Sequence, residues 1–438
     1  MTATPFPGFS TDTLDNRIVN PDIVAQPAKI HEVYRELRET DPVHWTEPTG
    51  FRPFWAITKQ ADIKAVSKAN ETFINAERTY IAPVENEEWI VAQTGDSHLF
   101  RTLVDMDDPL HKKLRQITNE WFLPKNLRTL EDKIRKIARE HVDRMAALGG
   151  ECDFVNEVAL FYPLRVIMEI LGVPPEDEPL MLKMTQEMFG SGDPDVVARS
   201  EKITRGPNGP TAGGSGEDAV DLMALAQEYF AYFGAMVEDR KRNPTDDVAT
   251  VIAKAEVDGE PIDLRHALSY FVIIASAGHD TTSSSTAGGF LQLVKNPEQL
   301  AKLQANPKLM MQAVEESIRW ETPVKHFMRT CTADTMVGEQ EIKAGEHLAM
   351  FYWSGNFDRE AFEAPDRFDV TRAPNPQVAF GGGAHQCLGL HLARLEIRIL
   401  FEELIPSLKS IALAGDTAWT RSNFVSGLKR FPIRYEMS

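Results

Sequence analysis

Apolar and polar residues alternate with two periods along this chain, and the helical period dominates. Apolar side chains recur every three to four residues, which places them on one face of an α-helix. This spacing predicts helices over residues 30–40, 59–69, 127–147, 162–171, 180–189, 219–237 and 268–294. Strand-like stretches are short: residues 44–45 and 54–58 flank a Pro/Gly turn and predict two strands. The pattern therefore predicts a mainly α-helical fold with small β-sheets, of the α+β class.

Three stretches lack a clear period. Residues 1–28 are rich in proline and predict an irregular N-terminal arm on the surface, and residues 75–105 give mixed signals. Residues 190–216 are rich in Gly, Pro and Ser and predict a mobile loop. Because the apolar helices on either side of this loop can pack on one core, it does not mark a domain boundary. We expect residues 1–438 to form a single domain.

Charge and cysteine content narrow the class of protein. The 438 residues carry a formal net charge of −18, which argues against nucleic acid or an anionic membrane as a partner. The longest apolar run, near residues 268–278, is shorter than the roughly 20 residues of a membrane helix. The first residues show no signal-peptide pattern. Three cysteines without a Cys-x-x-Cys pair fit a reducing compartment, so we expect a soluble, cytoplasmic protein.

One glycine-rich stretch carries the strongest chemical signal. Residues 380–389 read Phe-Gly-Gly-Gly-Ala-His-Gln-Cys-Leu-Gly, and a helix-forming run follows at residues 388–401. Glycines allow a backbone to approach a flat ligand closely, and a thiolate at a helix start is stabilised by the helix dipole and free N–H groups. This arrangement suits a cysteine bound axially to haem iron. Taken alone, a buried and inert Cys387 would be the simpler interpretation.

At these residues the chain resembles the cytochrome P450 family, whose haem-binding signature is Phe-x-x-Gly-x-[His/Arg]-x-Cys-x-Gly. Every fixed position is met between residues 380 and 389. The resemblance covers nearly the whole chain, and it is strongest to soluble bacterial members, notably one that hydroxylates the monoterpene alcohol terpineol. It implies a triangular-prism catalytic domain with haem b between a long central helix and the cysteine loop. Cys387 would bind the iron, and the haem-binding residues of the loop would be Phe380, Gly381, His385, Cys387 and Gly389.

The long helix predicted at residues 268–294 contains a second motif. Residues 277–282 read Ala-Gly-His-Asp-Thr-Thr and fit the family's [Ala/Gly]-Gly-x-[Asp/Glu]-Thr-[Thr/Ser], where the helix kinks and opens a groove for dioxygen. The resemblance implies that Ala277 and Gly278 contact the haem, that Thr281 hydrogen-bonds the dioxygen and that Asp280 passes protons to it. Six hydroxyl residues in a row are poor helix formers, because their side chains compete for backbone hydrogen bonds. An exposed Ser/Thr-rich helix end capped by Asp280 is the alternative interpretation.

Basic residues in two other segments are candidates for binding the haem propionates. The segment 107–115 is predicted to open a helix, with Asp107 as its N-cap and Pro109 in the first turn. His111 and Arg115, four residues apart, share a face of it. A solvated basic face is the plain interpretation. The resemblance implies instead that His111 and Arg115, with Arg329 of the segment 323–329 and with His385, surround the propionates.

Glu316 and Arg319 lie three apart on a predicted helix and can form an ion pair. In the family such a pair is buried and binds an arginine of a later Pro-x-Arg-Phe segment, which here is Arg367. We assign these three residues a structural role in fixing the haem loop. Residues 356–359, Asn-Phe-Asp-Arg, depart from the Asn-Arg-Asp of many relatives, and we interpret this as a surface difference.

The substrate pocket would be built from several segments. The apolar candidates are Leu103, Ile274, Val324, Phe327, Met328, Phe424 and Val425. For an aromatic residue and a methionine in a strand, ordinary core packing is an equally good interpretation.

The motifs together imply a haem-thiolate monooxygenase that hydroxylates a small apolar substrate, a monoterpenoid or an alkyl-substituted aromatic molecule. Electrons would come from a [2Fe–2S] ferredoxin and its flavoprotein reductase, and we expect a monomer. A basic docking patch is predicted from Lys112, Lys113, Arg115, Arg394 and Arg398. Two alternatives remain: a peroxide-using haem-thiolate peroxygenase, against which the Asp280-Thr281 pair argues, and a non-enzymatic haem-binding sensor.

Overall fold

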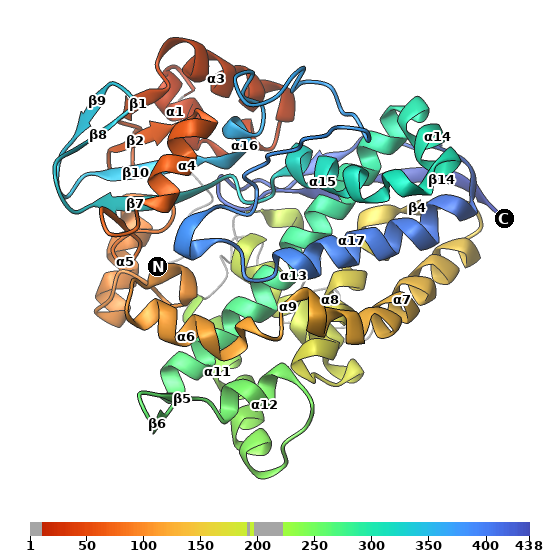
Figure 1. Ribbon diagram of the computed structural model, residues 1–438, viewed down its shortest axis with the longest axis horizontal. Helices are drawn as coiled ribbons and strands as arrows, with labels where there is room; N and C mark the ends of the chain where they lie inside the picture. The colour runs from red at the N-terminus through yellow and green to blue at the C-terminus, as the bar shows by residue number, and fades with distance from the viewer. Residues whose placement is uncertain (1–10, 191–192, 197–221) are drawn as a thin grey trace.

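The computed structural model describes residues 11–190, 193–196 and 222–438. Helices make up most of it, and the larger sheet gathers at one end beside α3 and α4 (Figure 1). The α-helices are α1 (Leu14–Val19), α2 (Pro21–Val24), α3 (Pro27–Thr40), α4 (Gln60–Lys68), α5 (Val84–Thr94), α6 (Leu110–Asn119), α7 (Pro124–Ala147), α8 (Phe161–Leu171), α9 (Glu178–Gly190), α11 (Leu222–Arg242), α12 (Val248–Ala253), α13 (Leu264–Lys295), α14 (Pro297–Ala305), α15 (Met310–Glu321), α16 (Tyr352–Gly355) and α17 (Leu390–Leu404). Short 3₁₀ or π turns are η1 (Leu103–Asp105), η2 (Val155–Ala159), η3 (Pro175–Asp177), η4 (Pro307–Leu309), η5 (Gly383–His385) and η6 (Ile405–Ser407).

The strands form one five-stranded sheet, one three-stranded sheet and three two-stranded ribbons in the described residues. The five-stranded sheet has the order β1-β2-β10-β7-β3; only β2 and β10 run parallel. Its strands are β1 (Val43–Thr46), β2 (Phe54–Ile57), β3 (Phe73–Ile74), β7 (His326–Cys331) and β10 (His347–Phe351). The three-stranded sheet, in the order β11-β14-β4, contains β4 (Glu151–Asp153), β11 (Leu408–Leu413) and β14 (Pro432–Met437). The ribbons pair β5 (Glu256–Val257) with β6 (Glu260–Pro261), β8 (Thr335–Val337) with β9 (Gln340–Ile342), and β12 (Ala418–Trp419) with β13 (Leu428–Arg430).

The predicted fold class is confirmed, but the predicted N-terminal arm is wrong for residues 11–28. These residues form α1, α2 and the start of α3, because the Thr13 and Asn20 side chains accept the first free N–H groups of α1 and α2. Ile18 and Val24 of these helices are buried with one face of the five-stranded sheet. Most of the mobile loop predicted at residues 190–216 lies outside the described residues.

The central helix α13 runs without a break from Leu264 to Lys295, through the segment where an interruption was predicted. Its hydroxyl residues satisfy themselves locally: the side chains of Ser284, Ser285 and Thr286 each donate to the carbonyl four residues earlier, at 2.7–2.9 Å. The expected competition between the hydroxyls and the backbone hydrogen bonds therefore does not break the helix, because the hydroxyls bond to carbonyls within it.

Glycines let α13 approach its neighbours closely. A Cβ at Gly278 would lie 2.9 Å from Cδ1 of Ile167 on α8, and one at Gly289 would lie 2.2 Å from Oγ of Ser317 on α15. Helix α13 is thus packed tightly against α8 at Gly278 and against α15 at Gly289. Figure 1 shows α17 alongside α13, with α7 beyond it.

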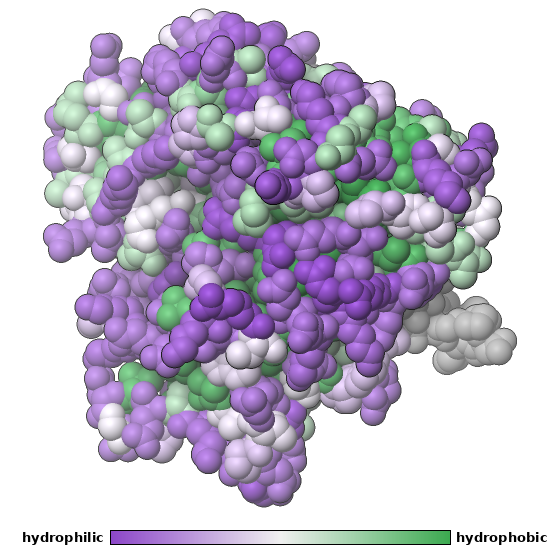
Figure 2. Space-filling view, turned by 45° about the vertical axis from the view of Figure 1, so that its right-hand side comes forward, coloured by the Kyte–Doolittle hydropathy of each residue, from purple (hydrophilic) through white to green (hydrophobic). Residues whose placement is uncertain are grey.

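The outer surface of the molecule is mainly polar. Figure 2 shows a mainly hydrophilic face with hydrophobic residues chiefly in its recesses. Within residues 11–190, 193–196 and 222–438, no helix is both long and apolar enough to cross a membrane.

Candidate functional site: the cysteine loop and the central helix

The cysteine loop has a defined backbone. The Cys387 N–H donates to the Phe380 carbonyl at 2.9 Å, and α17 begins three residues later. Burial raises the pKa of the Cys387 thiol, whereas the Gly389 amide and Arg115 lower it. The loop therefore turns back on itself and presents one partly buried sulfur at the start of a helix.

The glycines of this loop serve a contact that the sequence did not indicate. Gly383 has φ +66°, and a Cβ there would lie 1.9 Å from the backbone oxygen of Ser67 on α4. The loop is pressed against α4, so Gly383 is needed for protein packing and for its left-handed backbone. At Gly389, by contrast, a Cβ would meet no protein atom within 4 Å.

The four side chains predicted around the propionates, two histidines and two arginines, lie close to one another. The rings of His111 and His385 stack at 4.0 Å between centroids, and Arg115 donates to the Gln386 carbonyl at 2.6 Å. Burial, followed by the charges of His111, Arg329 and Arg115, lowers the pKa of His385 to about 2. Arg329 is 3% exposed, and burial lowers its pKa. A bound anion would relieve this mutual repulsion.

Of the two carboxylates beside this cluster, Asp107 is engaged elsewhere, whereas Asp108 Oδ1 lies 3.5 Å from Nδ1 of His111. Both Asp107 oxygens accept backbone N–H groups, of Asn75 and of Ala76, at 2.9 Å each. Asp107 was predicted to cap α6, and that prediction is wrong: the N-cap position is Pro109. His111 keeps its Nε2 buried without a hydrogen-bond partner in the described part of the chain.

The predicted acid, Asp280, and the predicted alcohol, Thr281, both lie on α13. The Thr281 hydroxyl donates to the Ala277 carbonyl at 2.8 Å, which leaves its oxygen lone pairs available as acceptors. Asp280 is 7% exposed, and its Oδ1 accepts from Nε2 of Gln186 at 2.7 Å. Next to it, the fully buried His279 is fixed by the Leu160 carbonyl at Nε2 and by Thr185 at Nδ1, at 2.8 and 2.9 Å.

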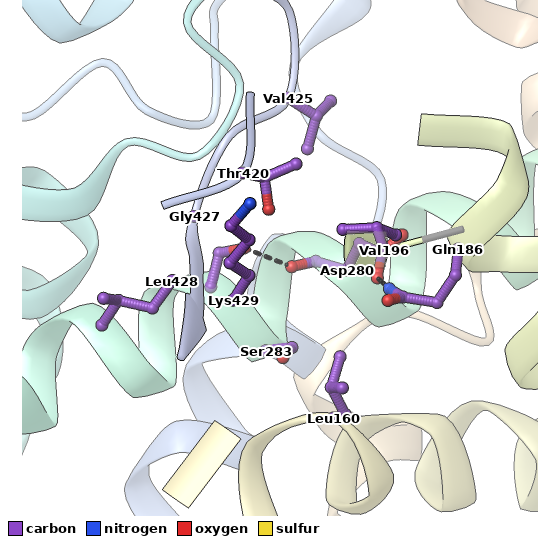
Figure 3. Close-up of a pocket in the computed structure, with 11 residues that line it drawn as sticks. Leu160, Gln186, Val196, Asp280, Ser283, Thr420, Val425, Gly427, Leu428 and Lys429 are labelled. Atoms are coloured by element: carbon purple, nitrogen blue, oxygen red, sulfur yellow. Dashed lines mark hydrogen bonds between the residues drawn. The ribbon is translucent and has the colours of Figure 1, made fainter. Parts of the chain in front are cut away.

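A small cavity of about 40 Å³ lies beside Asp280, large enough to hold water. Figure 3 shows Gln186 reaching from α9 toward Asp280, with Thr420, Val425 and Lys429 on the C-terminal segment across the cavity. The ammonium of Lys429 is neutralised by Asp193 and Asp195 at 2.8 and 2.7 Å. On the side of α9, Asp280 is therefore surrounded by polar groups.

The buried ion network contains Glu316 and Arg319 as predicted, but Arg367 is not its third member. Arg319 donates to both Glu316 oxygens at 2.8 Å, and both side chains are fully buried. The third partner is Arg372, whose Nε lies 2.9 Å from Glu316 Oε2. Arg367 is exposed, and only its backbone carbonyl takes part, by accepting from Arg372 at 2.8 Å.

Residues 356–358 belong to the same network, so their interpretation as surface is also wrong. Asn356 is fully buried, and its carbonyl accepts from Arg319 at 2.7 Å while its side chain binds Thr322 and Val378. The Phe357 ring packs 5.0 Å from the Arg319 guanidinium. The segment holds the arginine from the side opposite Glu316.

The structure brings four of the predicted substrate-pocket residues together. Val324 pairs with Val425 in an isolated β-bridge, and the Phe327 and Phe424 rings lie 5.4 Å apart. Leu103 and Ile274 share the main core cluster, and η1 contacts α13. Met328 is an error of the prediction: neighbouring residues of a strand face opposite sides, and Met328 is fully buried in the other cluster, with α3.

The predicted basic docking patch is largely neutralised. Arg394 is ion-paired with Glu315, and Arg398 pairs with Glu131 and Glu402. Lys113 lies 2.7 Å from Asp258. Of the five residues, only Lys112 and Arg115 have no ion pair within the described residues, and Arg115 faces the cysteine loop.

Comparison with known proteins identifies the family. The sequence model of cytochrome P450 matches residues 22–429. Cytochrome P450-terp of a Pseudomonas species is 42% identical over 420 residues, which cover 95% of this chain and 96% of that protein. Linalool 8-monooxygenase of Pseudomonas putida is 30% identical and covers 94% and 97%. The crystal structure of CYP108D1 from Novosphingobium aromaticivorans matches with a TM-score of 0.87, 42% identity, and coverage of 97% and 98%. The chain belongs to the cytochrome P450 family.

The chain is therefore an oxidoreductase of the monooxygenase type with haem b as its cofactor. The residues fit this group. Cys387 offers a single sulfur, and the stacked histidines with two arginines offer a cationic lining for carboxylates. The buried Nε2 of His111 has no partner in the described residues, and it would donate to a propionate oxygen in the tautomer or charge state that protonates this nitrogen.

Sequence reasoning missed Gln186 and Arg372. A Thr-Gln pair in the otherwise apolar stretch of α9 was a signal for Gln186. Arg367 was preferred because it stands in the Pro-x-Arg-Phe segment, and no local pattern pointed to Arg372 five residues later.

Proposed function

We propose that this chain hydroxylates a small, mostly apolar substrate, a monoterpenoid or an alkyl-substituted aromatic molecule, with dioxygen and two electrons from a [2Fe–2S] ferredoxin. The observation that carries the proposal is the Asp280-Thr281 pair on α13, with water-sized space beside the acid. The names cytochrome P450-terp and linalool 8-monooxygenase support a terpenoid substrate class. So does the related CYP268A2 of Mycobacterium marinum, whose structure is a complex with pseudoionone (TM-score 0.83, 31% identity, 98% and 99% coverage).

Each residue has a part in this scheme. When bound, thiolate-ligated haem supplies dioxygen binding and reductive activation. Cys387 is the ligand, and His111, Arg115, Arg329 and His385 orient the cofactor through its carboxylates. Thr281 would hydrogen-bond the bound dioxygen, and Asp280 would take up a proton from water in the cavity and pass it toward Thr281. Glu316, Arg319 and Arg372 hold the segment that leads to the cysteine loop.

The pocket wall would exclude water from the substrate. Phe327, Phe424, Val324 and Val425 join the segments after α15 and before β13, and Leu103 and Ile274 approach from η1 and α13. A wall of this kind binds through apolar contact and rejects polar bulk. We place electron entry on the side of the cysteine loop, near Lys112, since Arg115 faces that loop and the remaining three predicted cations are ion-paired.

The decisive experiment supplies ferredoxin, reductase, NADH and dioxygen to the haem-loaded protein with a panel of terpenes and alkylbenzenes, and measures product. We expect one hydroxylated product from a terpenoid. A parallel reaction with hydrogen peroxide alone tests the peroxygenase alternative, which would give product at a matching rate. A haem-binding sensor would give no product in either reaction.

Thr281→Ala tests the assigned role of the alcohol. The variant should bind substrate as the parent does, because Thr281 is not part of the proposed pocket wall, but it should divert electrons to hydrogen peroxide instead of product. Oxygen electrode measurements with peroxide and product assays give the ratio. Unchanged coupling would remove Thr281 from the scheme.

A further inference from the structure

The Tyr229 hydroxyl is a buried polar group that the scheme above does not use. Tyr229 lies on α11, its side chain is fully buried, and its oxygen has no hydrogen-bond partner in the described parts of the chain. A buried hydroxyl without a partner costs about 1–3 kcal/mol. A group retained at such a cost calls for a partner outside the described residues, and a bound molecule can supply one.

Aromatic contacts place the Tyr229 ring between α11 and α13. The Tyr229 ring meets Phe100 edge-on at 6.1 Å and stacks on Phe233 at 5.9 Å, and Phe233 in turn stacks on Phe271 of α13 at 5.0 Å. Phe100 precedes Leu103 of η1, which contacts α13. The ring is therefore held where α11, α13 and the segment before η1 meet, next to residues that form the proposed pocket.

Electrostatics agree with this location. Burial and then the carboxylates of Asp280 and Glu187 raise the pKa of Tyr229 well above its usual range. Asp280 belongs to the oxygen groove on α13, and Glu187 lies on α9. The phenol consequently keeps its proton and presents a hydrogen-bond donor.

We propose that the Tyr229 hydroxyl donates a hydrogen bond to an oxygen atom of the substrate and so fixes the orientation of the substrate over residues 277–281. This rests on the proposed function and narrows it: the substrate class becomes monoterpenoids that already carry one oxygen, such as an alcohol or a ketone. A single donor in an otherwise apolar wall selects for one acceptor at one position. A hydrocarbon of the same shape would leave the hydroxyl unpaired and bind less well.

The test compares the haem-loaded parent protein with Tyr229→Phe and with a matched control, Tyr34→Phe. The Tyr34 hydroxyl is also buried without a partner in the described residues, but it lies in the N-terminal cluster. Each protein is titrated with α-terpineol and with limonene, its hydrocarbon counterpart, and the dissociation constants are taken from the change in the haem spectrum. Tyr229→Phe should weaken α-terpineol binding about 3- to 10-fold, as expected for one hydrogen bond, and leave limonene binding within about 2-fold. Tyr34→Phe should change neither.

Other outcomes distinguish a failure of this inference from a failure of the proposed function. If Tyr229→Phe changed both ligands equally or neither, the hydroxyl would serve packing or bind only water, and this inference would be overturned while the proposed function stood. If the parent protein responded to neither ligand but to fatty acids or sterols alone, the proposed substrate class would fall, and the inference with it. Thermal unfolding of the ligand-free variants adds a check: a lowered transition for Tyr229→Phe would mean that the hydroxyl has a partner in the protein, which would also overturn the inference.

Discussion

Replacing Arg372 by alanine should destabilise the holoenzyme far more than replacing Arg367. The Arg372 guanidinium contacts the fully buried Glu316 carboxylate at 2.9 Å and donates to the carbonyls of Glu363, Ala364 and Arg367 at 2.7, 3.1 and 2.8 Å. Breaking a buried ion pair costs about 3–5 kcal/mol. Glu316 keeps its two bonds from Arg319, so we expect the lower end, about 3 kcal/mol. Arg367 is exposed, and its loss should cost no more than about 0.5 kcal/mol.

The assay is urea unfolding of both variants and the parent, followed by tryptophan fluorescence, with haem absorbance recorded in parallel. In Arg372→Ala both midpoints should fall, and the haem signal should be lost first, because the network anchors the segment that leads to the cysteine loop. Arg372→Lys should recover part of the loss through its single charge. If Arg367→Ala proved as harmful as Arg372→Ala, or if the latter cost less than about 1 kcal/mol, the network described here would not be what holds the loop.

Three further predictions concern single residues. Gly383→Ala should prevent stable haem incorporation, because its Cβ would overlap the backbone oxygen of Ser67, whereas Gly382→Ala, with φ −163°, should load haem normally; equal haem content would contradict this. Gln186→Leu removes the hydrogen-bond donor that holds Asp280 and should lower the ratio of product formed to dioxygen consumed, while an unchanged ratio would exclude the contact from proton delivery. Burial raises the pKa of Glu396 well above its usual value, so the folded state holds a proton that the unfolded state releases above about pH 4.5. In urea titrations, the free energy of unfolding of the parent protein, relative to that of Glu396→Gln, should therefore fall by up to about 1.4 kcal/mol per pH unit above that pH. If the two unfolding free energies differed by the same amount at every pH between 5 and 8, a protonated Glu396 carboxyl would be refuted.

Fixed spacing made much of the site predictable. The cysteine signature, the Asp280-Thr281 pair and the His111/Arg115 pair each lie within one local segment, where helix or loop geometry alone brings the residues together. Their mutual approach followed from the family resemblance, and the stacking of His111 on His385 agrees with it.

The errors arose where tertiary packing decides between local equivalents. Arg367 and Arg372 differ only in which way a loop turns. Met328 lies one position from Phe327, so a strand places it in the opposite cluster. Asn356 and Phe357 read as polar loop, yet they surround Arg319 and are buried by it. In each case the outcome depends on a partner more than 20 residues away in the sequence, which no local pattern encodes.

The wall of the proposed pocket is tied together by main-chain bonds. Lys325 donates its backbone N–H to the Phe424 carbonyl at 2.8 Å, and Ser426 donates to Pro323 at 3.0 Å. Because the main chain carries this connection, side chains at Val324 and Val425 can be exchanged without undoing it. Natural variation, or a laboratory library restricted to such positions, would then explore new substrates at little cost to folding. That separation of scaffold from recognition offers a route by which one such chain could acquire many specificities.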